Sequence, residues 1–150
     1  MMKKHSHITG FYVETLMMIV VFLLIILLLT QVFGLAQMQS TKAKRLNGAV
    51  VLAQNAAEAV SASETAEDLL ALLNENDNAF PMTDTAGVTA CYDSELNPDA
   101  GGTYRLDVTW LPEKTENGTM VRSVAEVRCD EAEAPVYRLE TERFRMEVGA

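Results

Sequence analysis

The sequence contains few residues of the kinds that carry out chemistry. Its only two histidines, His5 and His7, lie near the N-terminus, so the rest of the chain cannot form a Ser–His or Cys–His pair. It has no glycine-rich phosphate loop, and its two cysteines have no nearby histidine with which to hold zinc. Oxygen-bearing side chains alternate over residues 93–99, but Pro98 stands where a calcium loop needs glycine, so an acidic surface loop is the simpler interpretation. We therefore expect a protein that is not an enzyme and that uses no metal and no cofactor.

Charge is absent from one long stretch of the chain, and proline from a longer one. No charged side chain occurs in residues 15–41, the run Leu16–Leu29 is wholly apolar, and no proline precedes Pro81. About 20 apolar residues are enough to cross a bilayer as a helix. The sequence therefore predicts a single-pass membrane protein with a transmembrane helix over residues 11–36.

Basic residues are scarce in the remainder of the chain. From Leu46 to Ala150 there are seven Lys or Arg against twenty Asp or Glu, a net charge of −13. Nucleic-acid binding needs a basic surface, so DNA or RNA is not an expected partner. The other basic residues flank the apolar stretch, at Lys3, Lys4, Lys42, Lys44 and Arg45.

The N-terminal residues form a recognisable pattern. A short basic segment ends in Gly10, Phe11 follows it, and Glu14 precedes the long apolar run. Over about residues 3–60 this arrangement resembles the type IV prepilins and pseudopilins, which carry a cleavage and methylation motif of this kind. The resemblance implies that residues 1–10 are a leader, that a prepilin peptidase of the membrane cuts between Gly10 and Phe11, and that the new Phe11 amine is methylated.

Glu14 departs from the family pattern by one position. The family's glutamate is usually the fifth residue of the mature chain, and cleavage after Gly10 makes Glu14 the fourth. The resemblance implies that this carboxylate pairs with the N-terminal amine of a neighbouring subunit, because a lone charge in apolar surroundings is costly. The alternative is a glutamate that stays solvated at the membrane edge. The shifted position favours a minor pilin or a pseudopilin over a major subunit.

The orientation of the chain rests on two conflicting indications. The resemblance implies a cytoplasmic N-terminus and an extracytoplasmic C-terminal domain, at the cell surface if the protein is assembled. The flanking charges alone predict the reverse, because more basic residues follow the apolar stretch than precede it. In the extracytoplasmic orientation, Cys91 and Cys129 form a candidate disulfide, with two unlinked core thiols as the alternative.

Helical periodicity continues beyond the membrane segment. Residues 37–62 are rich in helix formers, and their apolar positions recur at spacings of three and four. This pattern predicts an amphipathic continuation of the same helix, with a buried face made of Leu46, Val50, Ala53, Ala57 and Val60. A second, short helix is expected within residues 61–77.

The short helix has start signals and an apolar face of its own. Ser63 or Thr65 can cap it, and Pro81 marks the loop beyond it. Its expected buried face consists of Leu69, Leu70, Leu72 and Leu73.

Residues 63–150 are expected to form a globular α+β ectodomain. Strands are predicted at 87–92, 103–111, 120–129 and 136–148, the last with a break near Glu142, and 112–119 reads as a turn with an Asn117-Gly118 hairpin signal. The expected fold is thus a long N-terminal helix packed on a small antiparallel sheet, as in pilins. The expected function is a structural subunit of a type IV pilus or of a secretion pseudopilus, which assembles with other subunits through its N-terminal helix. The alternative is an uncleaved membrane protein whose acidic ectodomain binds a partner or ligand.

Overall fold

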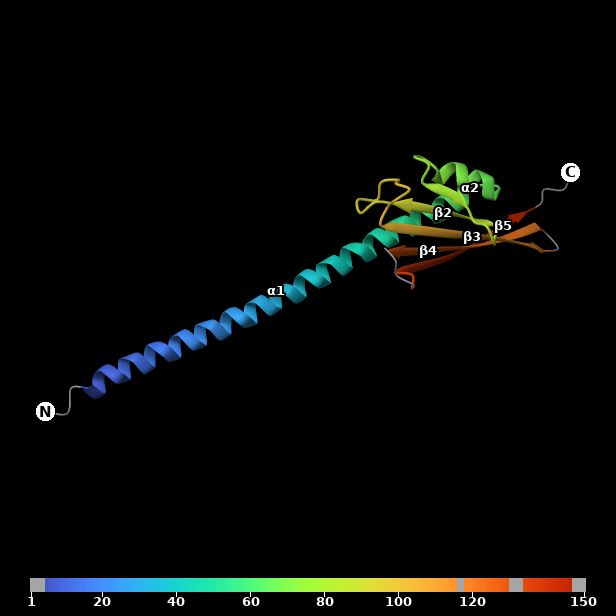
Figure 1. The fold of residues 1–150 in the computed structure, drawn as a ribbon. Helices are drawn as coiled ribbons and strands as arrows, with labels where there is room; N and C mark the ends of the chain where they lie inside the picture. Colours follow the sequence, from blue (N-terminus) through green and yellow to red (C-terminus); the bar gives the residue numbers. More distant parts are fainter. Residues whose placement is uncertain (1–4, 116–117, 130–133, 147–150) are drawn as a thin grey trace. The chain divides into compact units, whose positions relative to one another are not determined.

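A computed structural model describes the backbone of residues 5–115, 118–129 and 134–146, and the side chains of these residues apart from 5–9 and 146. Helix α1 spans His5–Ala62 and helix α2 spans Ala66–Leu73 (Figure 1). Five strands follow: β1 (Ala79–Pro81), β2 (Gly87–Tyr92), β3 (Tyr104–Thr115), β4 (Gly118–Cys129) and β5 (Tyr137–Met146). The α+β class, with a long N-terminal helix and an antiparallel sheet, is confirmed.

The chain divides into two compact units. We call Met1–Lys42 the N-terminal unit and Ala43–Ala150 the globular unit. The described part of the N-terminal unit is helical, and its side chains from residue 10 onward are all exposed. The hydroxyls of Thr15, Thr30 and Thr41 each donate to the carbonyl four residues earlier, at 2.9 to 3.0 Å. Because these hydroxyls are satisfied within the helix, they add little cost to its transfer into lipid.

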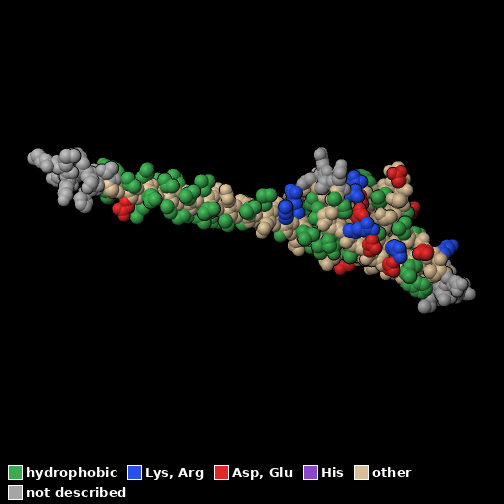
Figure 2. Space-filling model, turned by 90° about the horizontal axis from the view of Figure 1, so that it is seen from below, with side chains coloured by type: hydrophobic (Ala, Val, Ile, Leu, Met, Phe, Trp, Pro, Cys, Tyr) green, Lys and Arg blue, Asp and Glu red, His purple; other side chains and the backbone are tan. Residues whose placement is uncertain are grey.

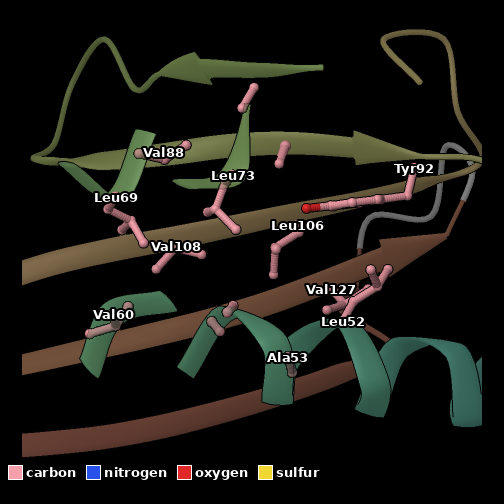
Figure 3. Packing of buried hydrophobic residues seen from close by; sticks show 14 of the residues in the cluster. Leu52, Ala53, Val60, Leu69, Leu73, Val88, Tyr92, Leu106, Val108 and Val127 are labelled. Atoms are coloured by element: carbon pink, nitrogen blue, oxygen red, sulfur yellow. The ribbon is translucent and has the colours of Figure 1, made fainter. Parts of the chain in front are cut away.

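In the globular unit, α1 packs on the sheet through its smallest residues. The buried positions are Gly48, Ala49, Leu52, Ala53, Ala56 and Val60. The expected face is confirmed at Ala53 and Val60 and was wrong elsewhere: Leu46 is 46% exposed, and Val50 and Ala57 are only half-buried. Close approach of the backbone decides the face, since a Cβ on Gly48 would lie 2.9 Å from the Tyr104 hydroxyl of β3. Figure 3 shows Leu52, Ala53 and Val60 close to the inner side chains of the sheet.

Helix α2 begins at a reciprocal cap. The Thr65 hydroxyl accepts from the Asp68 amide at 3.1 Å, and the Asp68 carboxylate accepts from the Thr65 amide at 3.0 Å. A hydrogen-bonding contact of the Thr65 side chain with the Asp68 carboxylate, and then the amides of Glu64 and Thr65, hold the pKa of Asp68 below its usual value. Thr65 is thus the cap, one of the two predicted candidates.

Only part of the predicted apolar face of α2 is buried. Leu69 and Leu73 are buried beside β1 and β2, and Leu70 is half-buried against the same core. Leu72 was expected inside but is 51% exposed, because at 100° per residue it lies about 100° around the helix from Leu73 and about 160° from Leu70.

The sheet is antiparallel throughout and its strands follow chain order, β1-β2-β3-β4-β5. Its inner face is apolar: Val88, Ala90, Tyr104, Leu106, Val108, Trp110, Ala125 and Val127 all belong to one buried cluster. The predicted strand at 87–92 is confirmed. Strands β3 and β4 run further than expected, pairing as far as Thr115 and Gly118, so most of the predicted turn at 112–119 is strand. Asn117 lies outside the described residues.

Two further strand predictions were wrong. Strand β5 pairs with β4 without a break, and Glu142 lies directly opposite Arg122 in continuous register. Strand β1 was not predicted at all: Pro81, interpreted as a loop marker, is its last residue. Proline is tolerated there because β1 lies at the sheet edge and needs no outward N–H.

The change of pattern along β5 has a different explanation from a bulge. All four residues Tyr137, Leu139, Arg143 and Arg145 lie on the same face of β5. The first two pack against the core, and the two arginines follow them further along the strand. Arg143 donates to the Ser61 carbonyl, and Arg145 donates to the carbonyls of Ser63 and Glu64, at 2.5 and 3.0 Å. Ser61 lies in the last turn of α1, and Ser63 and Glu64 directly follow the helix, so the two arginines bind carbonyls at and just beyond its negative end.

We predict that Leu69→Ala lowers the free energy of unfolding of the globular unit by about 2 to 5 kcal/mol, because it leaves a cavity in the core. The matched control on the same helix is Leu72→Ala, which should cost less than about 1 kcal/mol because its side chain is exposed. Thermal and urea unfolding of the full chain in detergent measures both. Equal losses would contradict the packing of α2.

Candidate functional site

The residues that carry the sequence motif lie together on α1. Gly10, Phe11 and Glu14 occupy one short stretch of this helix, and all three are exposed. Phe11 is 68% exposed, and its ring meets the neighbouring Tyr12 ring edge to face with centroids 6.3 Å apart. Phe11 and Glu14 are three residues apart, so they lie on nearly the same side of the helix, about 4.5 Å apart along its axis.

Packing within the chain does not account for Gly10. A Cβ built at this position meets no atom within 4 Å. Glycine inside a helix costs about 1 kcal/mol relative to alanine. No packing contact in the described structure therefore requires glycine at position 10. If this glycine has a role, it is in recognition of the segment by another molecule.

The surroundings of Glu14 are apolar. Met17, Met18 and Phe22 lie on the same stretch of helix surface. None of the ion pairs formed among the described residues includes Glu14. A carboxylate in this setting needs water or a cation from another chain.

The outer face of the sheet carries a ladder of paired charges. At its centre the Asp107 side chain, 8% exposed, accepts from Thr89 at 2.7 Å and from Arg105 at 3.1 Å, and it pairs with Arg128 at 3.3 Å. The ladder continues from Arg128 to Glu126, Arg138 and Glu140 through ion pairs of 2.6 to 3.4 Å. Alternating charges in 105–107, 126–128 and 138–140 are its signal in the sequence, but alternation within one strand does not show which charges on neighbouring strands face each other. Because each carboxylate has its cations, the ladder is a structural element of the sheet.

The acidic loop after β2 is closed by its own hydrogen bonds. One Asp93 oxygen accepts from the amides of Glu95 and Asn97 at 2.8 and 2.9 Å, and the other accepts from the Asn97 side chain at 3.0 Å. The bonds from Asn97, its side chain first, lower the pKa of Asp93. In the part of the chain that the structure describes, no three His, Cys, Asp or Glu side chains are grouped as a metal site requires.

The candidate disulfide is not formed in the described structure. Cys91 and Cys129 are both thiols. Cys91 lies opposite Arg105 on the outer face, whereas Cys129 lies opposite Tyr104 on the buried inner face, and β3 separates their strands. Side chains on opposite faces of a sheet cannot reach one another, so the expectation of a bond between them is corrected.

Comparisons with protein-family models, with curated proteins and with solved structures found no match to this chain. The structure by itself therefore supports a fold class and a candidate membrane span, and it does not assign a family. Helix α1 is long and apolar enough near the N-terminus to span a membrane.

We predict that the unreduced, denatured protein takes up two equivalents of an alkylating reagent. In the folded protein Cys129, only 3% exposed, should react only on unfolding. Cys91 should react more slowly than a free cysteine at pH 8, because burial raises its pKa and leaves less thiolate. Single Cys→Ser variants followed by intact-mass spectrometry separate the two rates. If the unreduced protein is lighter than the reduced protein by two hydrogens and takes up no alkylating reagent, the two cysteines are bonded and the prediction is wrong.

Proposed function

We propose that this protein is a structural subunit of a type IV pilus-like filament or of a secretion pseudopilus, in a minor position, and that it assembles through the first part of α1. The observation that carries the proposal is the contrast along one helix. From Phe11 to Met38 the apolar side chains of α1 are not covered by any described residue, whereas between Gly48 and Val60 one side of the same helix is buried on the sheet.

The exposed apolar stretch requires another apolar environment. A patch of this size does not persist in water, so it must be covered by lipid, by helices of other subunits, or by both in turn. A helix that leaves the membrane to enter a filament needs this property. The Gly10-Phe11 junction directly before it supplies the site at which a prepilin peptidase would release the mature chain.

Glu14 fits an assembly role once the leader is removed. Cleavage would make Phe11 the N-terminal residue, with a charged amine at the start of an apolar helix. Inside a helical bundle that amine needs a carboxylate, and Glu14 is the only acidic residue between residues 1 and 57. The pairing would join one subunit to the next.

A second candidate is an uncleaved single-pass membrane protein with an acidic ectodomain that binds a partner. The observation in its favour is the group of basic residues just after the apolar stretch, at Lys42, Lys44 and Arg45, which favours the reverse orientation. The pilin proposal requires that the leader motif, and not the flanking basic residues, determines the orientation of the chain in the membrane. The mature N-terminus distinguishes the two candidates.

We predict that co-expression with a prepilin peptidase yields a chain that begins at methylated Phe11, and that Gly10→Val leaves the leader attached. The matched control is Gly34→Val on the same helix, because a Cβ at Gly34 also meets nothing within 4 Å and should leave cleavage intact. Intact-mass spectrometry reads both. A wild-type chain that keeps residues 1–10 beside an active peptidase would favour the anchor candidate.

We predict that Glu14→Gln leaves membrane insertion and cleavage unchanged but reduces incorporation into filaments, because the Phe11 amine loses its counter-charge. Glu58→Gln is the control, an exposed glutamate in the second part of the same helix. The double change Glu14→Val, Thr15→Glu tests whether the usual fifth position works better. The measurement is the fraction of protein in sheared filaments. Equal fractions for the wild type and all variants would show that Glu14 has no role in assembly.

A further inference from the structure

A group of three basic residues follows the apolar stretch of α1. Lys42, Lys44 and Arg45, here called the basic collar, are all exposed. Figure 2 shows Lys and Arg side chains gathered on α1 where its run of hydrophobic side chains ends. At about 100° per residue the three side chains spread over nearly half of the helix circumference.

The rest of the fold uses most of its positive charge internally. Outside the collar and the N-terminal segment, the chain has seven basic residues. Four of them pair with carboxylates on the sheet: Arg105, Arg122, Arg128 and Arg138. Arg143 and Arg145 bind carbonyls at the end of α1. Only Lys114, exposed on β3, resembles the collar lysines.

Within the described structure, Lys42 and Lys44 of the collar are in none of the ion pairs with carboxylates and none of the hydrogen bonds to carbonyls described above. No acidic residue lies between Glu14 and Glu58, so α1 itself offers them no partner at helical spacing. The ion pairs among the described residues leave out Lys42 and Lys44. Arg45 does take part in an interaction within the fold.

The position of the collar along the helix matches the depth of lipid headgroups. Lys42 lies six residues beyond Ala36, the last residue of the expected span, which is about 9 Å at 1.5 Å per residue. The headgroup layer adds about 5 to 7 Å beyond the hydrocarbon on each side. Lysine bends its ammonium group back along its stem, so Lys42 and Lys44 reach that layer.

We propose that the basic collar binds the phosphates of anionic phospholipids in the leaflet next to it. The proposal rests on membrane insertion of α1 and is independent of leader cleavage, so it holds for either candidate function. The phospholipid is the partner because the collar adjoins the apolar span, where headgroup phosphates are concentrated. The basic flank then has a lipid-binding role that does not depend on which way the chain is oriented.

The test measures which lipids the full chain retains. Purified protein in mild detergent is mixed with equal amounts of phosphatidylglycerol and phosphatidylcholine, and native mass spectrometry counts the bound lipids. Each lysine near an anionic surface contributes about fivefold to binding, so we expect at least that preference for phosphatidylglycerol. Lys42→Gln with Lys44→Gln should remove most of the preference, and Lys42→Arg with Lys44→Arg should keep it.

Three controls make the result decisive. Lys114→Gln should leave the preference unchanged, and unchanged thermal unfolding of the collar variants shows that the fold is intact. Excess inorganic phosphate should not abolish lipid selection; if it does, the collar is a free-anion site and the assignment to lipid is wrong. Equal retention of the two lipids by the wild-type chain, or an undiminished preference in the double glutamine variant, would also overturn the proposal.

Discussion

The close packing of α1 on the sheet is the contact on which the globular unit depends. Ala49, Ala53 and Ala56 are buried in the same cluster as the inner side chains of the sheet, and Gly48 leaves room for the Tyr104 side chain, where a Cβ would clash. Leu52 and Val60 fill the space that remains (Figure 3). Arg143 of β5 then binds a carbonyl in the last turn of α1, and Arg145 binds two carbonyls just beyond it, so the last strand holds the end of the first helix.

This contact also limits what the rest of the helix can do. A helix presents one continuous surface, and its burial in the globular unit is limited to one side between Gly48 and Val60. Among the described residues of the N-terminal unit the apolar side chains are exposed all round the helix, so lipid or other helices would be needed to cover them. The change occurs at the basic collar, where the apolar character ends and one-sided burial begins. The proposed assembly and the proposed lipid contact both follow from this change along one helix.

The open face of the sheet is stabilised by a different means. It has no helix in the described structure, and the ladder centred on Asp107 covers it with charges that satisfy each other. A set of paired charges resists edge and face association without requiring a partner. The charges of this face are therefore satisfied within the described structure, and the two proposals concern the N-terminal motif and the collar.

The sequence by itself determined the features that depend on neighbours along the chain. The absence of charge from 15–41 and of proline before Pro81 predicted one long apolar helix, and alternation predicted the main strands; for the start of α2 the sequence offered Ser63 or Thr65, and the structure shows that Thr65 is the cap. Tertiary structure decided which side of α1 is buried, how far β3 and β4 extend, and that Pro81 ends an edge strand. It also placed Cys91 and Cys129 on opposite faces. Each of these depends on how closely distant segments approach, and periodicity in one segment carries no information about the size of its partner's side chains.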